Sequence, residues 1–193
     1  WVMKKYVIFA LGGIILAGSL IFAGLFPVAK VNGDLLWYRE FSAYQGAFNR
    51  FRANIERASS LESPSLGFEN IAEGDLAMSL LEELIAKKII FGAGNTLFTG
   101  FNQNTGDIIK EALGGKSIQS LEEAAETLYG LSLEEFEELI LLPEAEEILL
   151  RRAVESSGQN YEEWFLQQLK AADVKIYFYD YVWQDGGLVG EQQ

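Results

Sequence analysis

The sequence has no cysteine and no histidine among its 193 residues. Without cysteine the chain forms no disulfide bond, offers no thiol nucleophile and lacks the thiolate ligands of many zinc and iron–sulfur sites. Without histidine it lacks the side chain most often used for acid–base catalysis near neutral pH and as the base of a catalytic triad. We therefore expect no enzymatic activity, no catalytic residue, no cofactor and no metal site.

Acidic residues are absent from the first 33 positions, although the chain contains 28 of them. From Pro27 onward the chain carries 13 basic and 28 acidic side chains, a net charge of −15. Because nucleic-acid binding depends on lysine and arginine side chains that neutralise phosphates, this charge predicts no nucleic-acid partner. It favours solubility or a basic partner.

Charged residues are also absent from Tyr6 to Phe26, a run of 21 positions. At ~1.5 Å per residue a helix of this length spans a ~30 Å hydrocarbon core, and Lys4 and Lys5 before it favour a cytoplasmic N-terminus. We expect residues 1–26 to form a cytoplasmic stub and a transmembrane anchor, with the acidic remainder on the extracytoplasmic side, periplasmic or at the cell surface. A cleaved signal peptide is the alternative, although the run exceeds the ~7–15 apolar residues usual in such peptides.

A strand, a tight turn and the start of a helix are predicted over 28–41. Asn32-Gly33 is the strongest short-range signal for a type I′ turn, because asparagine tolerates a positive φ and glycine adopts one freely. From Trp37 to Ile55 large apolar residues recur at alternating spacings of four and three, which places them on one helical face. This face is either part of the core or a groove for a bound polypeptide. The second interpretation makes Phe48 and Phe51 candidate binding residues.

Two stretches, Ser59–Gly74 and Gly92–Gly106, are predicted to be loops, and a helix capped by Asp75 is predicted between them, ending at about Phe91. The second stretch contains four glycines but also three large apolar residues. These residues either pin the loop onto the core or lie exposed, where they would contact a polypeptide or a membrane. On the second interpretation the candidate binding residues are Phe91, Leu97, Phe98 and Phe101.

Capped helices are predicted in the next part of the chain. The cap pairs are Ser120 with Glu123, Ser132 with Glu135 and, in a looser form, Asn160 with Glu163. The helix interiors that follow them are 121–129, 133–142 and 161–172. Pro143 is expected to kink a helix or to start a new one.

Glutamate runs at 122–126, 134–138 and 144–147 accompany these helices. Paired carboxylates of this kind are able to support acid–base or metal chemistry. However, the glutamates alternate with leucine and isoleucine at the spacing of amphipathic helices, so we interpret them as solvated helix faces.

The last predicted element is a strand over Val174–Trp183, which is rich in β-branched and aromatic residues. A lone strand leaves its backbone polar groups unpaired, and the only other clear strand candidate is Val28–Val31 with the residues after its turn. We therefore predict that the two ends of one domain, 27–185, pair in a small sheet, and that 186–193 form a flexible tail. The predicted fold class is mainly α, with an N-terminal transmembrane helix before this helical domain.

The stretch Val28-Ala29-Lys30-Val31-Asn32-Gly33-Asp34, followed by a helix with an aromatic residue and Arg39-Glu40-Phe41, resembles the N-terminal domain of SurA-type and PrsA-type chaperones and parvulin foldases. Leu-Ser-Leu-Glu-Glu-Phe at 131–136 resembles a later helix start of that family, and 161–177 resemble its closing helix and strand. The similarity covers roughly 27–183 and is weak over 59–118.

The resemblance implies a chaperone domain of the SurA type, but the isomerase module of that family is missing. A parvulin domain spans about a hundred residues and usually carries paired histidines, whereas only four residues separate Ser156 from Tyr161 and the chain has no histidine. The resemblance therefore implies a membrane-anchored, extracytoplasmic protein of the cell envelope that binds unfolded or newly exported polypeptides, without proline isomerase activity. The alternative is a structural or adaptor subunit that docks one specific membrane or envelope protein.

Overall fold

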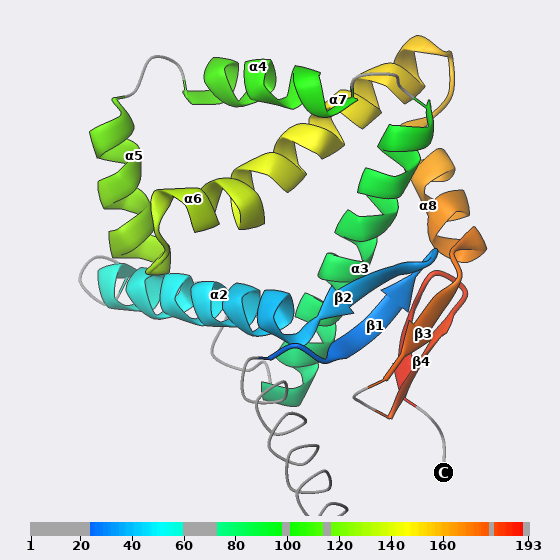
Figure 1. Cartoon of the computed structure of the whole chain (residues 1–193), viewed down its shortest axis with the longest axis horizontal. Helices are drawn as coiled ribbons and strands as arrows, with labels where there is room; N and C mark the ends of the chain where they lie inside the picture. Colours follow the sequence, from blue (N-terminus) through cyan, green and yellow to red (C-terminus); the bar gives the residue numbers. More distant parts are fainter. Residues whose placement is uncertain (1–23, 60–72, 98–100, 114–116, 178–179, 191–193) are drawn as a thin grey trace, which may run out of the picture.

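A helix of 25 residues, α3 (Glu73–Leu97), lies at the centre of the molecule (Figure 1). The computed structural model describes residues 24–59, 73–97, 101–113, 117–177 and 180–190. Within these ranges α3 contacts α2 (Tyr38–Ser59), α7 (Leu142–Ser156), α8 (Tyr161–Ala171) and the strand β1 (Pro27–Val31). The fold is mainly helical, with two small sheets at one side of α3.

The first sheet pairs the two ends of the domain, as the sequence predicts. Its order is β2-β1-β3, so β1 lies between β2 (Asp34–Trp37) and β3 (Val174–Ile176) and is antiparallel to both. The turn between β1 and β2 has a φ of 51° at Asn32 and 102° at Gly33. Two consecutive positive φ values in a two-residue loop are typical of a type I′ turn, so this prediction is also confirmed.

The second sheet corrects the prediction for the C-terminal region. The predicted strand over 174–183 is divided into β3 and β4 (Tyr181–Gln184), and β4 forms a hairpin with β5 (Gly187–Gly190). Residues 187–190 of the predicted flexible tail are therefore part of a sheet. The cause is the Asp185-Gly186 turn, with φ values of 54° and 92°, which reverses the chain just as Asn-Gly does.

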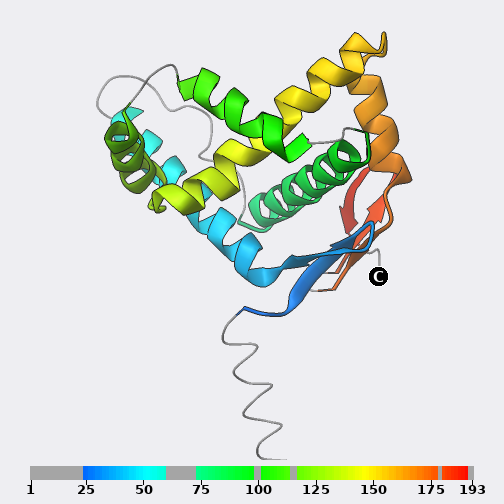
Figure 2. The ribbon, with the colours of Figure 1, turned by 45° about the horizontal axis from the view of Figure 1, so that its top comes forward.

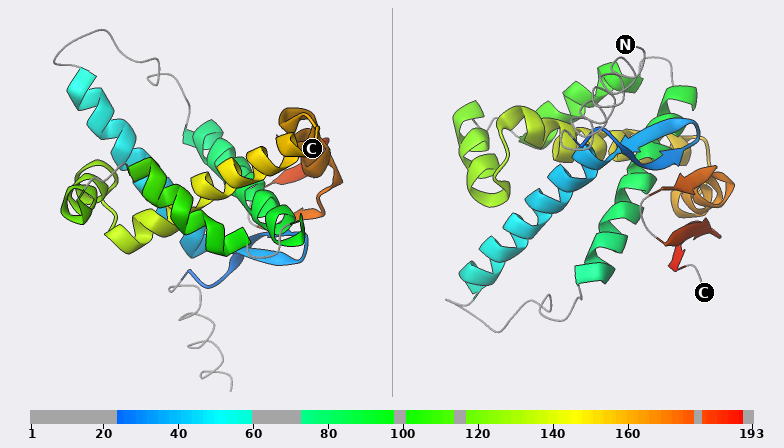
Figure 3. Two further views of the ribbon diagram at one scale, coloured as in Figure 1. Left: turned by 90° about the horizontal axis from the view of Figure 1, so that it is seen from above. Right: turned by 60° about the horizontal axis from the view of Figure 1, so that its bottom comes forward.

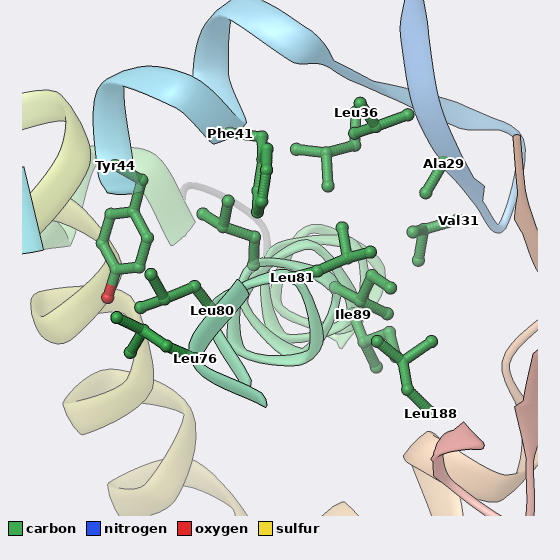
Figure 4. Close-up of a cluster of buried hydrophobic side chains, with 13 residues drawn as sticks. Ala29, Val31, Leu36, Phe41, Tyr44, Leu76, Leu80, Leu81, Ile89 and Leu188 are labelled. Atoms are coloured by element: carbon green, nitrogen blue, oxygen red, sulfur yellow. The ribbon is translucent and has the colours of Figure 1, made fainter. Parts of the chain in front are cut away.

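The main core surrounds α3 (Figure 4). Leu81 and Ile85 of this helix are completely buried, and Phe41 of α2 is 1% exposed. Burying a side chain of this size contributes ~1.5–3 kcal/mol. Leu188 of β5 joins the same cluster, which explains why the β4–β5 hairpin is held against the domain.

The chain between α3 and α7 forms a series of shorter helices. They are α4 (Phe101–Leu113), α5 (Ile118–Ala124), the π-helical turn η2 (Ala125–Tyr129), α6 (Leu133–Phe136) and the π-helical turn η3 (Glu137–Leu141). Helix α4 packs along α7, away from the β1–β2 hairpin (Figure 2). The α5–η2–α6 segment lies beside α2 (Figure 3).

The contact between α2 and η2 combines an aromatic stack with helix capping. The Phe51 and Tyr129 rings stack with centroids 4.8 Å apart. The Asn54 amide Nδ2 donates to the carbonyl oxygens of Thr127 and Leu128, at 2.8 and 3.0 Å. These bonds satisfy carbonyl groups at a helix C-terminus, which otherwise lack intrahelical donors.

Local helix signals are confirmed in part. Ser132 and Glu135 form the predicted capping box, and the Asn160 side chain accepts from the Glu163 N–H. The predicted cap at Ser120 is wrong, because Ser117 caps α5 and Ser120 lies inside it. Pro143 lies in the first turn of α7, where its missing N–H costs no intrahelical hydrogen bond.

The predicted loop over 92–106 is wrong. Helix α3 continues through Gly92 to Leu97, and α4 begins at Phe101. Each glycine costs a helix ~1 kcal/mol relative to alanine, but Ala93 packs against a second cluster formed by residues of α3, α7 and α8. Packing on α7 and α8 thus maintains the helix across the glycines.

The predicted fold class also requires correction at the N-terminus. Within the described residues, no helix has the length and apolar character needed to cross a membrane. Positions 6–23 of the predicted span lie outside the described residues. Its last part, 24–26, is not helical: Gly24 has a φ of 66°, and the Gly24 and Phe26 carbonyls accept from the N–H groups of Arg39 and Tyr38 at 3.2 and 2.9 Å.

Candidate functional site

Three neighbouring surface grooves each include residues of α3. The largest, which we call the turn groove, has a volume of about 490 Å³ and lies between the β1–β2 turn, the C-terminal part of α3 and α8. Its walls include Asn32, Phe91, Asn95, Leu97, Trp164 and Gln168. Its volume is within the ~300–1,000 Å³ usual for ligand sites.

The second groove, which we call the central groove, has a volume of about 250 Å³ and lies between β2, α3, η3 and α7. Its apolar walls are formed by Leu36, Leu84, Phe91, Leu139, Leu142 and Pro143. Its charged residues are Glu40, Lys87, Lys88, Glu138 and Glu146. The groove is therefore an apolar hollow that contains a few charged groups.

The third groove, which we call the tyrosine groove, has a volume of about 160 Å³. It is lined by aromatic residues of α2 and η2, with Lys87, Ile140 and Glu144 completing the walls. The aromatic residues are Tyr44, Phe48, Phe51 and Tyr129.

Neighbouring grooves share a wall residue. Phe91 belongs to both the turn groove and the central groove, and Lys87 belongs to both the central groove and the tyrosine groove. These two residues are four positions apart on α3, which corresponds to one helical turn and a rise of ~6 Å. That rise is close to the ~6.6 Å between side chains on the same face of an extended chain.

Four of the six candidate binding residues line this series. Phe48 and Phe51 line the tyrosine groove, while Phe91 and Leu97 line the turn groove. Phe91 is 39% exposed and Leu97 is 52% exposed, so both present apolar surface to the solvent. Phe98 lies outside the described residues. Phe101 is the first residue of α4, and the placement of its side chain is outside the described part of the chain.

Lys87 is held by two partners at the boundary of the central and tyrosine grooves. Its Nζ lies 3.0 Å from Glu83 Oε1 and donates to the Tyr44 hydroxyl oxygen at 2.8 Å. The Tyr44 hydroxyl in turn donates to Glu83. Burial, followed by the hydrogen bond to Glu83, raises the pKa of the Tyr44 phenol, so the hydroxyl keeps its proton and acts as a donor.

Lys88 is also paired within the central groove. Its Nζ lies 3.5 Å from Glu40 Oε1, and the other oxygen of Glu40 accepts from the Trp37 N–H at 2.8 Å. Glu40 therefore ties the end of β2 to α3. Both lysines of the central groove are thus engaged with carboxylates other than Glu146.

Glu146 is the functional candidate that the sequence interpretation missed. It lies on α7, is 5% exposed and lines the central groove. Burial raises the pKa of its carboxyl to about 7, and within the described residues no hydrogen bond or ion pair engages that carboxyl. The prediction that the glutamates at 144–147 form a solvated face is wrong for this residue.

A signal for Glu146 is present in the sequence. Glu146, Leu150 and Val154 follow one another at spacings of four, and all three are buried. A charged residue at a helical position that continues an apolar stripe faces the core rather than the solvent. Glu144, which is off this stripe, is exposed.

Comparison with known proteins does not assign the chain to a family. No protein-family model matches the chain, and searches of curated proteins and of solved structures give no match. Among the described residues there is no group of three or more acidic side chains placed to hold a metal ion.

Proposed function

We propose that this domain is chaperone-like and binds unfolded segments of other polypeptides in the three grooves along α3. The observation that carries the proposal is the series itself: three grooves joined by Phe91 and Lys87, with Phe91 partly exposed between two of them. The resemblance of 28–41 to SurA-type chaperone domains supports the same function. A location outside the cytoplasm stays a prediction from the sequence.

The dimensions of the central and tyrosine grooves favour an extended chain over a compact small molecule. The central and tyrosine grooves, at about 250 and 160 Å³, are smaller than the ~300–1,000 Å³ usual for small-molecule sites. Along α3 the central groove extends from Leu84 to Phe91, a rise of ~10 Å, so about three residues of an extended segment span it.

The exposed apolar residues provide the driving force. Burying the exposed part of Phe91 or Leu97 under a bound segment removes apolar surface from water. This burial contributes a favourable binding free energy of ~25 cal/mol per Å². Ordering an unfolded segment opposes this gain, so we expect weak, reversible binding to many segments rather than tight binding to one.

Suppression of aggregation tests the proposal. The full chain, in several-fold molar excess over a chemically unfolded client, is expected to reduce light scattering, and Phe91→Ala is expected to lose most of this effect. Leu166→Ala is the matched control, because Leu166 is 47% exposed on α8 and does not belong to the three grooves.

Two results would contradict the proposal. One is an absence of both suppression and peptide binding for the wild-type chain; the other is an equal loss for the two alanine variants. Stoichiometric binding to a single folded partner, with no binding to unfolded segments, would instead support the adaptor function.

A further inference from the structure

We infer that the central groove selects a basic side chain of the bound polypeptide, which pairs with the Glu146 carboxylate. This inference rests on the proposed polypeptide-binding function and specifies which segments bind best: those in which a lysine or arginine accompanies apolar side chains.

The first observation is that Glu146 has no cation of its own. The two lysines of the groove are engaged elsewhere, Lys87 with Glu83 at 3.0 Å and Lys88 with Glu40 at 3.5 Å. Within the described residues the Glu146 carboxyl makes no ion pair. A buried carboxylate without a partner is unfavourable. A cation of the bound polypeptide therefore supplies the partner that the Glu146 carboxylate lacks in the free domain.

The second observation is the shape of the site. Glu146 lies on α7 and lines a hollow whose other walls include Leu84, Phe91, Leu139 and Pro143. Lysine and arginine have long apolar stems that end in a charged head. A stem lying against these apolar walls places its head in the same hollow as the Glu146 carboxylate, where the two groups form a charge-assisted hydrogen bond.

The third observation is the charge of the whole chain. The formal net charge is −13 at pH 7, so its field attracts basic segments before contact. That attraction is long-range and screened by salt, whereas pairing at Glu146 depends on one residue. The two contributions are therefore separable by experiment.

Pairing with a cation requires Glu146 to be ionised, and its carboxyl has a pKa raised by burial to about 7. Binding of a basic side chain consequently competes with a proton, and the preference for it falls as the pH decreases below about 7. The other charged groups that line the groove are Glu40, Lys87, Lys88 and Glu138. Since they also belong to the site, the pH effect is assigned to Glu146 only if it disappears in the Glu146→Gln variant.

The test uses two unstructured ten-residue peptides with phenylalanine at alternate positions. One carries a central lysine, and the other carries norleucine, which has a similar stem without the charge. Binding to the full chain is measured by fluorescence anisotropy at pH 6 and pH 8 in 0.15 M salt. At pH 8 we expect the lysine peptide to bind roughly tenfold more tightly than the norleucine peptide. We expect this ratio of the two affinities to decrease at pH 6.

Two variants separate the site from the general field. Glu146→Gln is expected to reduce the ratio to about that of the net charge alone, while Glu137→Gln, which makes the same change in net charge at an exposed position, is expected to preserve it. Equal affinities for the two peptides, or equal losses in the two variants, would overturn the inference and leave the proposed function intact. Failure of both peptides to bind would refute the proposed function together with the inference.

Discussion

Replacing Gly33 with valine tests whether the β1–β2 turn organises the domain. Gly33 has a φ of 102°, a region that L-residues with a side chain rarely adopt. The turn also holds β3, because the Asn32 N–H donates to the Asp173 carbonyl at 2.8 Å and the Asp173 N–H donates to Asn32 Oδ1 at 2.9 Å. Distortion of the turn therefore affects both edges of the first sheet.

The expected loss is dominated by backbone strain. A Cβ at Gly33 would meet no heavy atom within 4 Å, so the substitution causes no clash. A positive φ costs an L-residue ~1–2 kcal/mol, and a β-branched side chain restricts the backbone further. We expect the free energy of unfolding to fall by about 2 kcal/mol, which corresponds to ~4–8 °C in Tm for a domain of this size.

Thermal unfolding followed by circular dichroism measures this loss. Gly33→Asn is the informative companion, because asparagine tolerates a positive φ better than valine, and it should lose less than half as much. If the valine variant unfolded at the wild-type temperature, the turn would be a passive connection and the reasoning would be wrong.

For three further substitutions the structure predicts whether the free energy of unfolding rises or falls. Gly46→Ala, on the exposed side of α2 where a Cβ meets nothing within 4 Å, should raise the free energy of unfolding by ~0.5–1 kcal/mol; a urea titration that shows no gain contradicts this. Gly130→Ala should lower the free energy of unfolding by ~1–2 kcal/mol through backbone strain, because Gly130 has a φ of 67°. The new Cβ would also lie 1.6 Å from Arg50 Nη1. Adding Arg50→Ala should relieve this clash but not the strain. Glu146→Gln should have little effect on stability near pH 4 and should stabilise the chain by ~3 kcal/mol at pH 8. The sign follows because the raised pKa of about 7 means that wild-type stability decreases as the pH rises from about 4.5 to 7, and urea titrations at the two pH values check it.

The parts of the fold that the sequence predicts are those determined by local backbone chemistry. Asn32-Gly33 requires two positive φ values wherever it occurs in a hairpin, and Ser132 with Glu135 satisfies helix N–H groups without help from distant residues. The pairing of β1 with β3 is a long-range contact, but it was predictable because an unpaired strand leaves its backbone groups unsatisfied.

The errors occur where tertiary packing overrides local preference. Gly92 favours a break in α3, yet Ala93 packs against the cluster shared with α7 and α8. This contact joins residues far apart in the sequence, so local sequence patterns do not predict it. The hairpin β4–β5 is a different kind of error. Asp185-Gly186 carries the same turn signal as Asn32-Gly33, but only four residues of described strand follow it, too short a run to be recognised as a strand from its sequence alone.

The candidate site shows the same division. The sequence predicts Phe51 from the spacing of a helix face, and Phe91 as one of the apolar residues at and after the predicted end of α3. It did not show that Phe91 and Lys87 would each separate two grooves, because a groove exists only once η3 and α7 lie against α3. The glutamate composition of 144–147 predicts a solvated face, whereas the position of Glu146 on the stripe that ends at Val154 predicts burial, and packing of α7 on the domain decides for burial.

Glu146 links stability and binding in opposite directions. In the unbound domain its ionised carboxylate lies among apolar walls without a cation, so neutralising it with glutamine stabilises the fold at pH 8. In the complex that we propose, the same carboxylate is the partner of a basic side chain, so the substitution weakens binding. A purely structural role for Glu146 predicts that the substitution changes stability but leaves the affinity for the lysine peptide, relative to the norleucine peptide, unchanged. A gain in stability together with a selective loss of affinity for the lysine peptide would therefore identify the central groove as a binding site rather than a packing defect.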